Sequence, residues 1–320
     1  MTNVKKNIDI NRKASSSSWF NGLVWISSFL ILFIFIGLIL KLLWGSQQAF
    51  ATFGIEFLTR AIWNPVTQQY GAVSAVLGTL VTSLIGIVIA IPLAFGSAYA
   101  LSEIIPIRIS RIVTPIIQLL AAVPSIIFGM WGFFFIVPLM ARYVQPFLKH
   151  NFGHIPILSA LFSGPPFGVG LFTGGLILAV MITPFIAAVM QNAFQNTPVL
   201  LKESAYSLGA TKWEIMRYVT LAWSKKAVLG GIILGWGRAL GETMAITFVI
   251  GNANKIGWSL FAPSNTISSL IALEFPESAT GSLKMSSLMG LGVILMVISF
   301  LALFCSRYLL RQSERKLRGN

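Results

Sequence analysis

Cysteine, histidine and charged side chains are all scarce in this chain of 320 residues. A single cysteine excludes an internal disulfide. With only two histidines beside it, the chain has too few ligands for a transition-metal site of its own, so we expect no bound metal. Charged residues make up only 10% of the sequence, whereas a soluble domain carries about a quarter. The composition therefore excludes an ordinary soluble domain.

The sequence contains several long runs of apolar residues. Hydrophobic residues make up 56% of the chain, and the mean hydropathy is +0.81. A run of about 20 apolar residues crosses a bilayer as a helix. We expect an all-α integral membrane protein with six transmembrane helices in a domain spanning 19–310, between a disordered basic head, 1–18, and a basic tail, 311–320. The expected spans are 23–40, 73–101, 112–140, 171–190, 227–250 and 287–308.

Lysine and arginine are distributed unequally between the two sets of connecting segments. Sixteen lie in the head, the second and fourth connections and the tail, whereas five lie in the first, third and fifth connections. Cytoplasmic segments carry the excess of basic residues. We therefore expect a multi-pass protein of the cell (inner) membrane with both termini in the cytoplasm. The net charge of +14 then reflects topology, and we expect no nucleic-acid partner.

The fourth connection has the pattern of two short helices. Pro198 suits the first turn of a helix, and Gly209 suits a left-handed helix end. Thr211, with Glu214 three residues later, is typical of a capping box. The pattern predicts a compact cytoplasmic pair of helices. The alternative is a hairpin that lies on the lipid surface.

Within this connection, "ESAYSLGATKWEIMRYVTLA" resembles the EAA loop of permeases of ABC importers. The resemblance implies that residues 198–222, hereafter the coupling loop, insert into a cleft of a cytoplasmic ATPase subunit. A glycine at its turn allows the tight shape that a cleft requires. The positions that match the motif are Glu203, Ala205, Gly209 and Leu221; those that depart from it are Ser204, Val219 and Ala222.

Four further segments resemble the permeases of phosphate-specific (Pst) ABC importers. They are "AAVPSIIFGMWG" (121–132), "LFSGPPFGVG" (161–170), "MITPFIAAVMQNAF" (181–194) and "GWGRALGETMAITFVIGN" (235–252). The resemblance implies the fold of a type I importer permease, of the MetI-like kind. It also implies a second, PstA-like permease, two PstB-like ATPase subunits and an extracytoplasmic, PstS-like phosphate-binding protein.

The chain has no G-x-x-x-x-G-K-[ST] sequence, which is the nucleotide-binding loop of ATPases. We therefore expect a transport subunit, not an enzyme, with no catalytic residue and no cofactor of its own. ATP and Mg²⁺ would be held by the ATPase partner. Two alternatives remain open: a permease for another oxyanion, such as sulfate or molybdate, and a secondary anion transporter or channel.

Arg238 and Glu242 lie four residues apart in the apolar fifth span. Each charge costs about 2.5–3.5 kcal/mol at the centre of a membrane helix. A pair at this spacing returns only about 0.2–0.5 kcal/mol. Both side chains must therefore face protein, water or ligand. One hypothesis is a buried ion pair that fixes helix packing. The other places Arg238 beside the translocated anion, because a guanidinium suits tetrahedral oxyanions, with Glu242 orienting it and limiting the affinity.

Small and aromatic residues add three expectations. Gly231 with Gly235, and Gly237 with Gly241, form two G-x-x-x-G patterns, which allow close helix packing within this chain or against a second permease. Proline is expected to kink the third and fourth spans, at positions 124 and 184. The aromatic residues between 44 and 70 predict an amphipathic segment at the membrane interface.

Overall fold

The computed structural model of the chain describes residues 18–255, 257 and 259–318, and the expected head lies almost entirely outside them. The described residues form helices and loops without a β-strand, which confirms the all-α fold. The first half contains α1 (Ser18–Phe53), α2 (Glu56–Thr59), α3 (Val73–Tyr99), η1 (Ala100–Ile104), α4 (Ile107–Ala122), α5 (Ser125–Trp131), η2 (Gly132–Ile136), α6 (Val137–Leu139), η3 (Met140–Val144), α7 (Gln145–Phe152) and α8 (Pro156–Leu161). The second half contains α9 (Leu171–Gln195), α10 (Val199–Ser207), α11 (Lys212–Glu214), η4 (Ile215–Thr220), α12 (Leu221–Leu240), α13 (Met244–Val249), α14 (Ile267–Glu274) and α15 (Leu283–Arg318). The segments named η are π-helical turns.

Five helices in the described part of the chain are long and apolar enough to cross a membrane: Trp19–Phe53, Val73–Ile104, Ser125–Phe152, Leu171–Gln195 and Leu283–Tyr308. Two expected spans differ from this set. The third is divided between α4 and α5, and the long apolar helix begins at Ser125, not at 112. The fifth consists of α12 and α13, and α12 carries three cations, Lys225, Lys226 and Arg238, which reduce its hydropathy.

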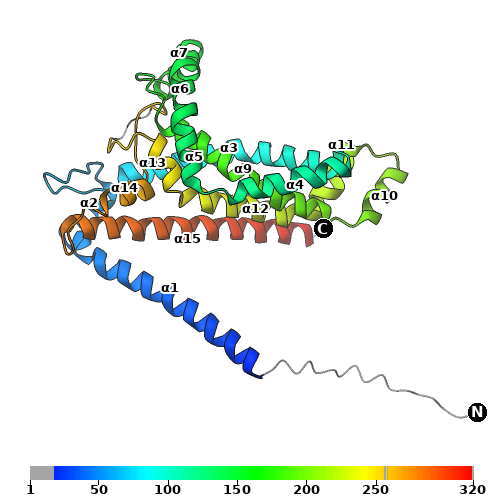
Figure 1. Cartoon of the computed structure of the whole chain (residues 1–320), viewed down its shortest axis with the longest axis horizontal. Helices are drawn as coiled ribbons and strands as arrows, with labels where there is room; N and C mark the ends of the chain where they lie inside the picture. Colours follow the sequence, from blue (N-terminus) through cyan, green and yellow to red (C-terminus); the bar gives the residue numbers. More distant parts are fainter. Residues whose placement is uncertain (1–17, 256, 258, 319–320) are drawn as a thin grey trace, which may run out of the picture.

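Helix α9 occupies the centre of the bundle. It packs along the length of α3 and also against α4 and α12 (Figure 1). The α3–α9 contact is close because glycine removes side-chain bulk: a Cβ atom on Gly175 would lie 2.5 Å from Ile85 Cγ2. Helix α9 continues through Pro184, where the sequence predicted a kink. The main hydrophobic core is therefore built around α9.

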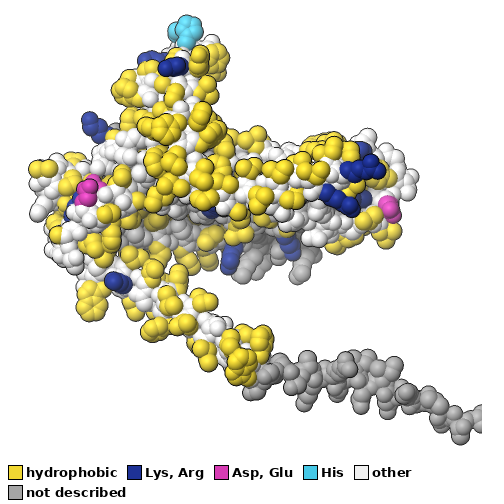
Figure 2. All heavy atoms as spheres, viewed as in Figure 1, with side chains coloured by type: hydrophobic (Ala, Val, Ile, Leu, Met, Phe, Trp, Pro, Cys, Tyr) yellow, Lys and Arg dark blue, Asp and Glu magenta, His cyan; other side chains and the backbone are white. Residues whose placement is uncertain are grey.

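Residues 125–152 form a helical arm that rises steeply from the bundle (Figure 1). Hydrophobic side chains cover much of the arm and of the bundle face below it (Figure 2). Phe134, Phe135 and Phe147 are among its exposed residues. Apolar surface of this kind requires lipid or another membrane protein around it.

Helix α1 packs against α15 near its C-terminal end and diverges from it toward the N-terminus (Figure 1). Ser46 and Ala49 are buried at the contact, and Gly45 lies against Met289 of α15. The span 19–40 is exposed or nearly so along its whole length. Most of α1 therefore makes no packing contact within this chain.

The aromatic segment between 44 and 70, which is predicted to be amphipathic and to lie at the membrane interface, buries several of its rings inside the protein. Phe57, Trp63 and Tyr70 are buried in a second hydrophobic core with α14 and α15. The rings of Trp63 and Tyr70 lie edge to face, with centroids 4.8 Å apart. The aromatic side chains pack on one another and on the ends of the helices, so these rings contribute to the core of the protein.

Candidate functional site

Two interrupted helices meet near Arg238. Helix α12 ends at Leu240 and α13 begins at Met244, so Gly241–Thr243 separates them. Between α4 and α5, the chain is extended at Val123 and Pro124, with ψ of 133° at both residues. The two halves beyond the breaks are in close contact, because a Cβ on Gly129 of α5 would lie 3.0 Å from Ala245 Cα of α13. Interrupted membrane helices expose backbone dipoles that can face an ion or a substrate.

Arg238 lies in the last turn of α12 and reaches across to the other break. Its Nη1 donates a hydrogen bond to the Ala121 carbonyl at 3.3 Å. Its guanidinium carbon lies 5.8 Å from the ring centroid of Phe185, within the range of a cation–π contact. A cation is also favoured at the C-terminal end of a helix. The side chain is half-buried, so the rest of its planar set of donors stays accessible beside the helix breaks.

Glu242 does not form an ion pair with Arg238 in this structure. Helix α12 ends between the two residues, so the four-residue spacing no longer places them on one helical face. The Glu242 carboxylate is buried, and its Oε1 accepts a hydrogen bond from the backbone N–H of Ala245 at 3.2 Å. The hypothesis of a buried Arg238–Glu242 ion pair is therefore wrong for this conformation. Glu242 instead fixes the start of α13.

The four glycines of the fifth span have different neighbours. A Cβ on Gly231 would lie 2.7 Å from Val189 Cγ1, and one on Gly235 would lie 2.6 Å from Ile186 Cδ1. Both glycines therefore pack against α9 within this chain. Gly237 lies near α15, whereas Gly241, between α12 and α13, is exposed.

The coupling loop has the predicted local structure. Helix α10 begins after Pro198, one residue later than expected, and Gly209 has a φ of +83° at the turn. Thr211 donates to Glu214 Oε2 from its backbone N–H at 2.7 Å and from its hydroxyl at 2.8 Å, and Glu214 N donates to Thr211 Oγ1. These bonds, the backbone bond first, lower the pKa of the Glu214 carboxyl below its ordinary 4.5. The capping box is thus confirmed.

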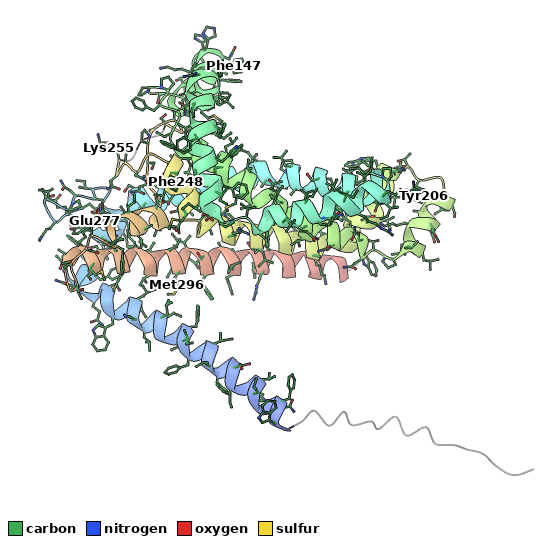
Figure 3. All side chains as sticks on the ribbon, in the orientation of Figure 1. Phe147, Tyr206, Phe248, Lys255, Glu277 and Met296 are labelled. Atoms are coloured by element: carbon green, nitrogen blue, oxygen red, sulfur yellow. The ribbon has the colours of Figure 1, made fainter. Side chains whose placement is uncertain are left out.

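The surface of the coupling loop is apolar and exposed. Leu200 is 73% exposed and Leu208 is 89% exposed. The loop projects beyond the ends of the bundle helices, where Tyr206 also points outward (Figure 3). Among the residues that match the EAA motif, Glu203 is exposed, Ala205 is half-buried, and Leu221 packs on the main core. Exposed leucines on a projecting loop are typical of a protein–protein contact.

Two contacts at the base of the coupling loop could not be found by motif. Lys202 of α10 forms an ion pair with Glu103 of η1, and Trp213 of α11 packs edge to face on Tyr99 of α3. Both pairs join residues about a hundred positions apart, and neither belongs to the EAA pattern. The only sequence signal was that Tyr99 and Glu103 lie at the expected cytoplasmic end of the second span, and Lys202 and Trp213 in a connection expected on the same side.

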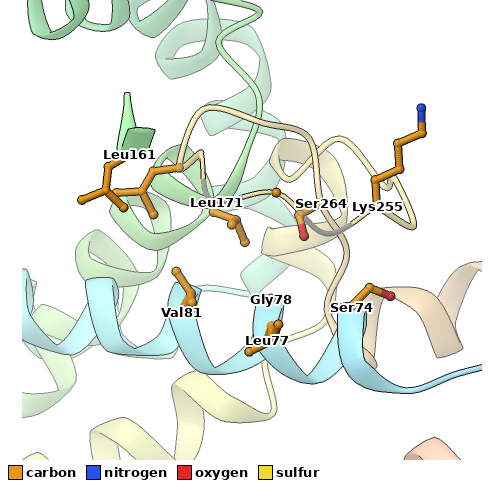
Figure 4. A pocket seen from close by; sticks show the side chains of 10 residues that line it. Ser74, Leu77, Gly78, Val81, Leu161, Leu171, Lys255 and Ser264 are labelled. Carbon is orange, nitrogen blue, oxygen red and sulfur yellow. The ribbon is translucent and has the colours of Figure 1, made fainter. Parts of the chain in front are cut away.

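A pocket of about 350 Å³ lies elsewhere in the bundle, between α3, the end of α8, the start of α9 and the loop that follows α13 (Figure 4). Its wall is mostly apolar, and Lys255 at its rim extends away from the cavity (Figure 4). A dehydrated anion needs several donors, and this cavity offers few polar groups. The pocket therefore does not suit an oxyanion. The lining residues are Ser74, Leu77, Gly78, Val81, Leu161, Leu171, Lys255, Gly257, Leu260 and Ser264.

Comparison with known families agrees with this architecture. Residues 90–319 match the family described as the binding-protein-dependent transport system inner membrane component. The chain belongs to this family of multi-pass inner-membrane permeases, whose members work in ABC importers with partner subunits. It is 51% identical to the phosphate transport system permease protein PstC of Pasteurella multocida, over 90% of each chain. It is 46% identical to PstC of Mesorhizobium japonicum, over 96% of this chain and 94% of that protein. The resemblance to phosphate-specific permeases is confirmed.

Solved structures support the fold. A bacterial alginate ABC transporter aligns with a TM-score of 0.60 at 16% identity, covering 91% of this chain and 95% of the matched chain. The inward-facing MetNI methionine ABC transporter aligns with a TM-score of 0.52 at 18% identity, covering 75% of this chain and 94% of the matched one. The chain therefore has the MetI-like fold of ABC-importer permeases, as expected.

Proposed function

We propose that this chain is the permease subunit of an ATP-driven importer and forms half of the pathway for inorganic phosphate. The observation that carries the proposal is the position of Arg238. Its guanidinium is half-buried at the meeting point of two interrupted helices, and one hydrogen bond to Ala121 holds it there. The identity of the relatives as phosphate permeases supports phosphate over sulfate or molybdate.

Arg238 would bind the anion through the donors that face away from Ala121. A planar guanidinium presents parallel N–H groups that match two oxygens of a tetrahedral oxyanion. Glu242 lies within the break between α12 and α13, where a negative charge opposes overly tight anion binding. Because its carboxylate is held by Ala245 N, this charge keeps a fixed position. A permease needs this balance, since the anion must also leave.

The coupling loop would connect this site to ATP hydrolysis. Its exposed leucines suit a cleft in a cytoplasmic ATPase, and two such subunits would hold ATP and Mg²⁺. A second, PstA-like permease would complete the pathway, and an extracytoplasmic phosphate-binding protein would deliver the anion. Both termini and the coupling loop would then lie in the cytoplasm, as the distribution of basic residues predicts. Closure of the ATPase dimer would move the loops and tilt the helices between inward-open and outward-open arrangements.

The test compares Arg238→Lys, Arg238→Gln and the double variant Arg238→Gln/Glu242→Gln in the assembled complex. The lysine variant keeps the charge and loses the bidentate geometry, so labelled phosphate uptake should fall at least about tenfold, equivalent to about 1.4 kcal/mol. The double variant should assemble and still fail to transport. The control is Arg142→Lys on the arm, with unchanged uptake expected.

Near-normal uptake by the double variant would remove Arg238 from the anion pathway. Phosphate uptake by this chain in membranes that contain no ATPase subunit would instead identify a secondary transporter or channel. Preferential uptake of sulfate or molybdate by the wild-type complex would replace phosphate as the substrate.

A further inference from the structure

The coupling loop is attached to the membrane helices by one largely buried ion pair. Lys202 Nζ of α10 lies 2.5 Å from Glu103 Oε1 of η1, and the side chains are 18% and 14% exposed. The same ammonium donates to the Phe194 carbonyl near the end of α9, at 3.4 Å. A single side chain of the loop therefore holds the ends of both α3 and α9. An ion pair at this burial is less screened by salt than a surface pair.

Helix α10 has little else to hold it. None of its residues is buried, and none of the residues of α11 is buried. The remaining contact of α11 is aromatic: the rings of Tyr99 and Trp213 lie 5.7 Å apart at 68°. Helix α10 contacts η4, but no buried side chain of α10 fixes it to α3, and the Lys202–Glu103 pair joins it to the end of that helix.

The backbone joins the coupling loop to the bundle at both ends, because residues 196–198 connect α9 to α10 and η4 leads into α12. η4 continues directly into α12, and its residues Ile215 and Met216 are buried in the bundle. A displacement of the loop would thus reach α9 and α12 through the backbone. It would reach α3 through Lys202 and the Tyr99 contact, and through the packing of α3 on α9. Since α12 carries Arg238 and α9 carries Phe185, which stacks on it, the two routes converge on the helices that form the candidate site.

We propose that the Lys202–Glu103 ion pair is a direct link that transmits movement of the coupling loop to the end of α3, and that it stays closed throughout the transport cycle. This inference rests on the proposed function, because it assumes that an ATPase moves the loop. With the pair intact, α3 tilts together with α9 and α12. Without it, α9 and α12 follow the loop through the backbone, α3 loses its direct ionic link to the loop, and less phosphate is transported per ATP hydrolysed. Lys202 and Glu103 are positioning residues, since neither contacts the anion.

A charge exchange tests the link in the complete complex. We expect Glu103→Lys and Lys202→Glu each to assemble and hydrolyse ATP, with phosphate uptake per ATP reduced at least about fivefold. The exchange Glu103→Lys/Lys202→Glu should return this ratio to within about twofold of wild type, because it restores the pair. The neutral variant Glu103→Gln/Lys202→Gln should assemble and stay uncoupled. Lys212→Glu, an equal charge change at an exposed position of the same loop, is the control.

The outcomes separate a link from a merely structural contact. Normal uptake per ATP by the neutral variant would show that the ion pair is not needed for coupling, and that the single variants fail only because they leave a buried charge unpaired. This outcome would overturn the proposal. So would an exchange variant that assembles and remains uncoupled. If the wild-type complex binds no ATPase or takes up no phosphate, the proposed function itself fails. If the wild-type complex takes up phosphate but the exchange variant remains uncoupled, the link is refuted and the proposed function still stands.

A reversible cross-link tests whether the pair stays closed. The chain has one cysteine, Cys305, so Cys305→Ser gives a background without thiols. In that background, Glu103→Cys/Lys202→Cys is bridged with a short, reducible bifunctional thiol reagent. We expect the bridged complex to transport within about twofold of the background protein. Loss of uptake on bridging, with recovery on reduction, would show that the contact must open, and would overturn the proposal.

Discussion

Arg238 and Glu242 have separate roles because a helix ends between them. Arg238 belongs to the last turn of α12, and Glu242 accepts a hydrogen bond from the first turn of α13. An uninterrupted helix would have placed the two charges on one face, where they could neutralise each other. The break leaves the guanidinium bound to the Ala121 carbonyl and the carboxylate bound to the Ala245 N–H.

Glu214 gives the coupling loop a defined response to acid. The hydrogen bonds from Thr211 lower the pKa of Glu214 in the folded loop, so the carboxylate stabilises the capping box above its ordinary value of 4.5. That stabilisation is lost only as the pH falls through the lowered pKa. A ¹³C NMR titration of the glutamate carboxyls should therefore show a midpoint for Glu214 below 4.5. The signal is identified by its loss in Glu214→Gln.

Thr211→Val separates the two sources of this shift. It removes the hydroxyl and keeps the backbone N–H, which has the larger effect on the pKa. The midpoint should move only part of the way back toward 4.5. A midpoint at 4.5 in the wild-type chain would mean that the capping box is not formed in solution.

The capping box could be read from sequence because all its members lie within four residues. Thr211 and Glu214 have the required spacing, and Gly209 marks the turn before them. The Lys202–Glu103 pair is different, because it depends on how the ends of α3 and α10 are brought together by the whole bundle. A sequence pattern predicts local hydrogen bonds well, but it does not predict which distant charges will meet.

At the scale of elements, glycine determines how closely α12 approaches α9. A methyl group on Gly235 would enter the space of Ile186 Cδ1, whereas Gly230 on the same helix has no neighbouring atom within 4 Å of an added Cβ. Gly235→Ala should therefore destabilise the purified chain by about 1–3 kcal/mol through overpacking. Gly230→Ala should be neutral or slightly stabilising because alanine favours a helix.

Thermal unfolding in detergent measures both variants against wild type. The expected result is a lower melting temperature for Gly235→Ala and an unchanged or higher one for Gly230→Ala. Equal melting temperatures for the two variants would mean that α12 and α9 are not in close contact.

Hydropathy located most of the membrane helices but not their interruptions. Helices α1, α3, α9 and α15 lie where long apolar runs predicted them. The break at Gly241–Thr243 was not apparent, because its flanking residues are as apolar as those of a continuous span. Pro124 predicted a kink, and the chain is instead extended there over two residues. Pro184 leaves α9 unbroken. A proline leaves a backbone carbonyl of its helix without a hydrogen-bond donor, and neighbouring helices determine whether that group finds another partner. A local sequence pattern does not contain this information.

At the scale of the whole molecule, the coupling loop presents apolar side chains away from the helices that cross the membrane. We expect Leu208→Asp to reduce retention of the ATPase by membranes carrying this permease at least about tenfold, or about 1.4 kcal/mol. The reason is that a charge would be buried in an apolar contact. Val66→Asp is a matched control, because Val66 is 91% exposed and Leu208 is 89% exposed.

Pull-down from solubilised membranes measures how much ATPase each permease variant retains. Val66→Asp should retain the ATPase as wild type does, since residue 66 lies in the connection assigned to the extracytoplasmic side. Full retention by Leu208→Asp, with normal uptake, would place the docking surface elsewhere.

The divergence of α1 from the bundle has a consequence for how the protein is made. The apolar window of α1 has a mean hydropathy of 2.8 and none of it is buried, whereas that of α9 has 2.1 and is 61% buried. Helix α1 can therefore enter the bilayer and remain there as soon as it leaves the ribosome, without waiting for later segments. Helix α12 is the opposite case, because Lys225, Lys226 and Arg238 make it costly in lipid alone. Biogenesis thus has a built-in order, in which the helix that carries Arg238 becomes stable only after α3 and α9 are in place to receive it.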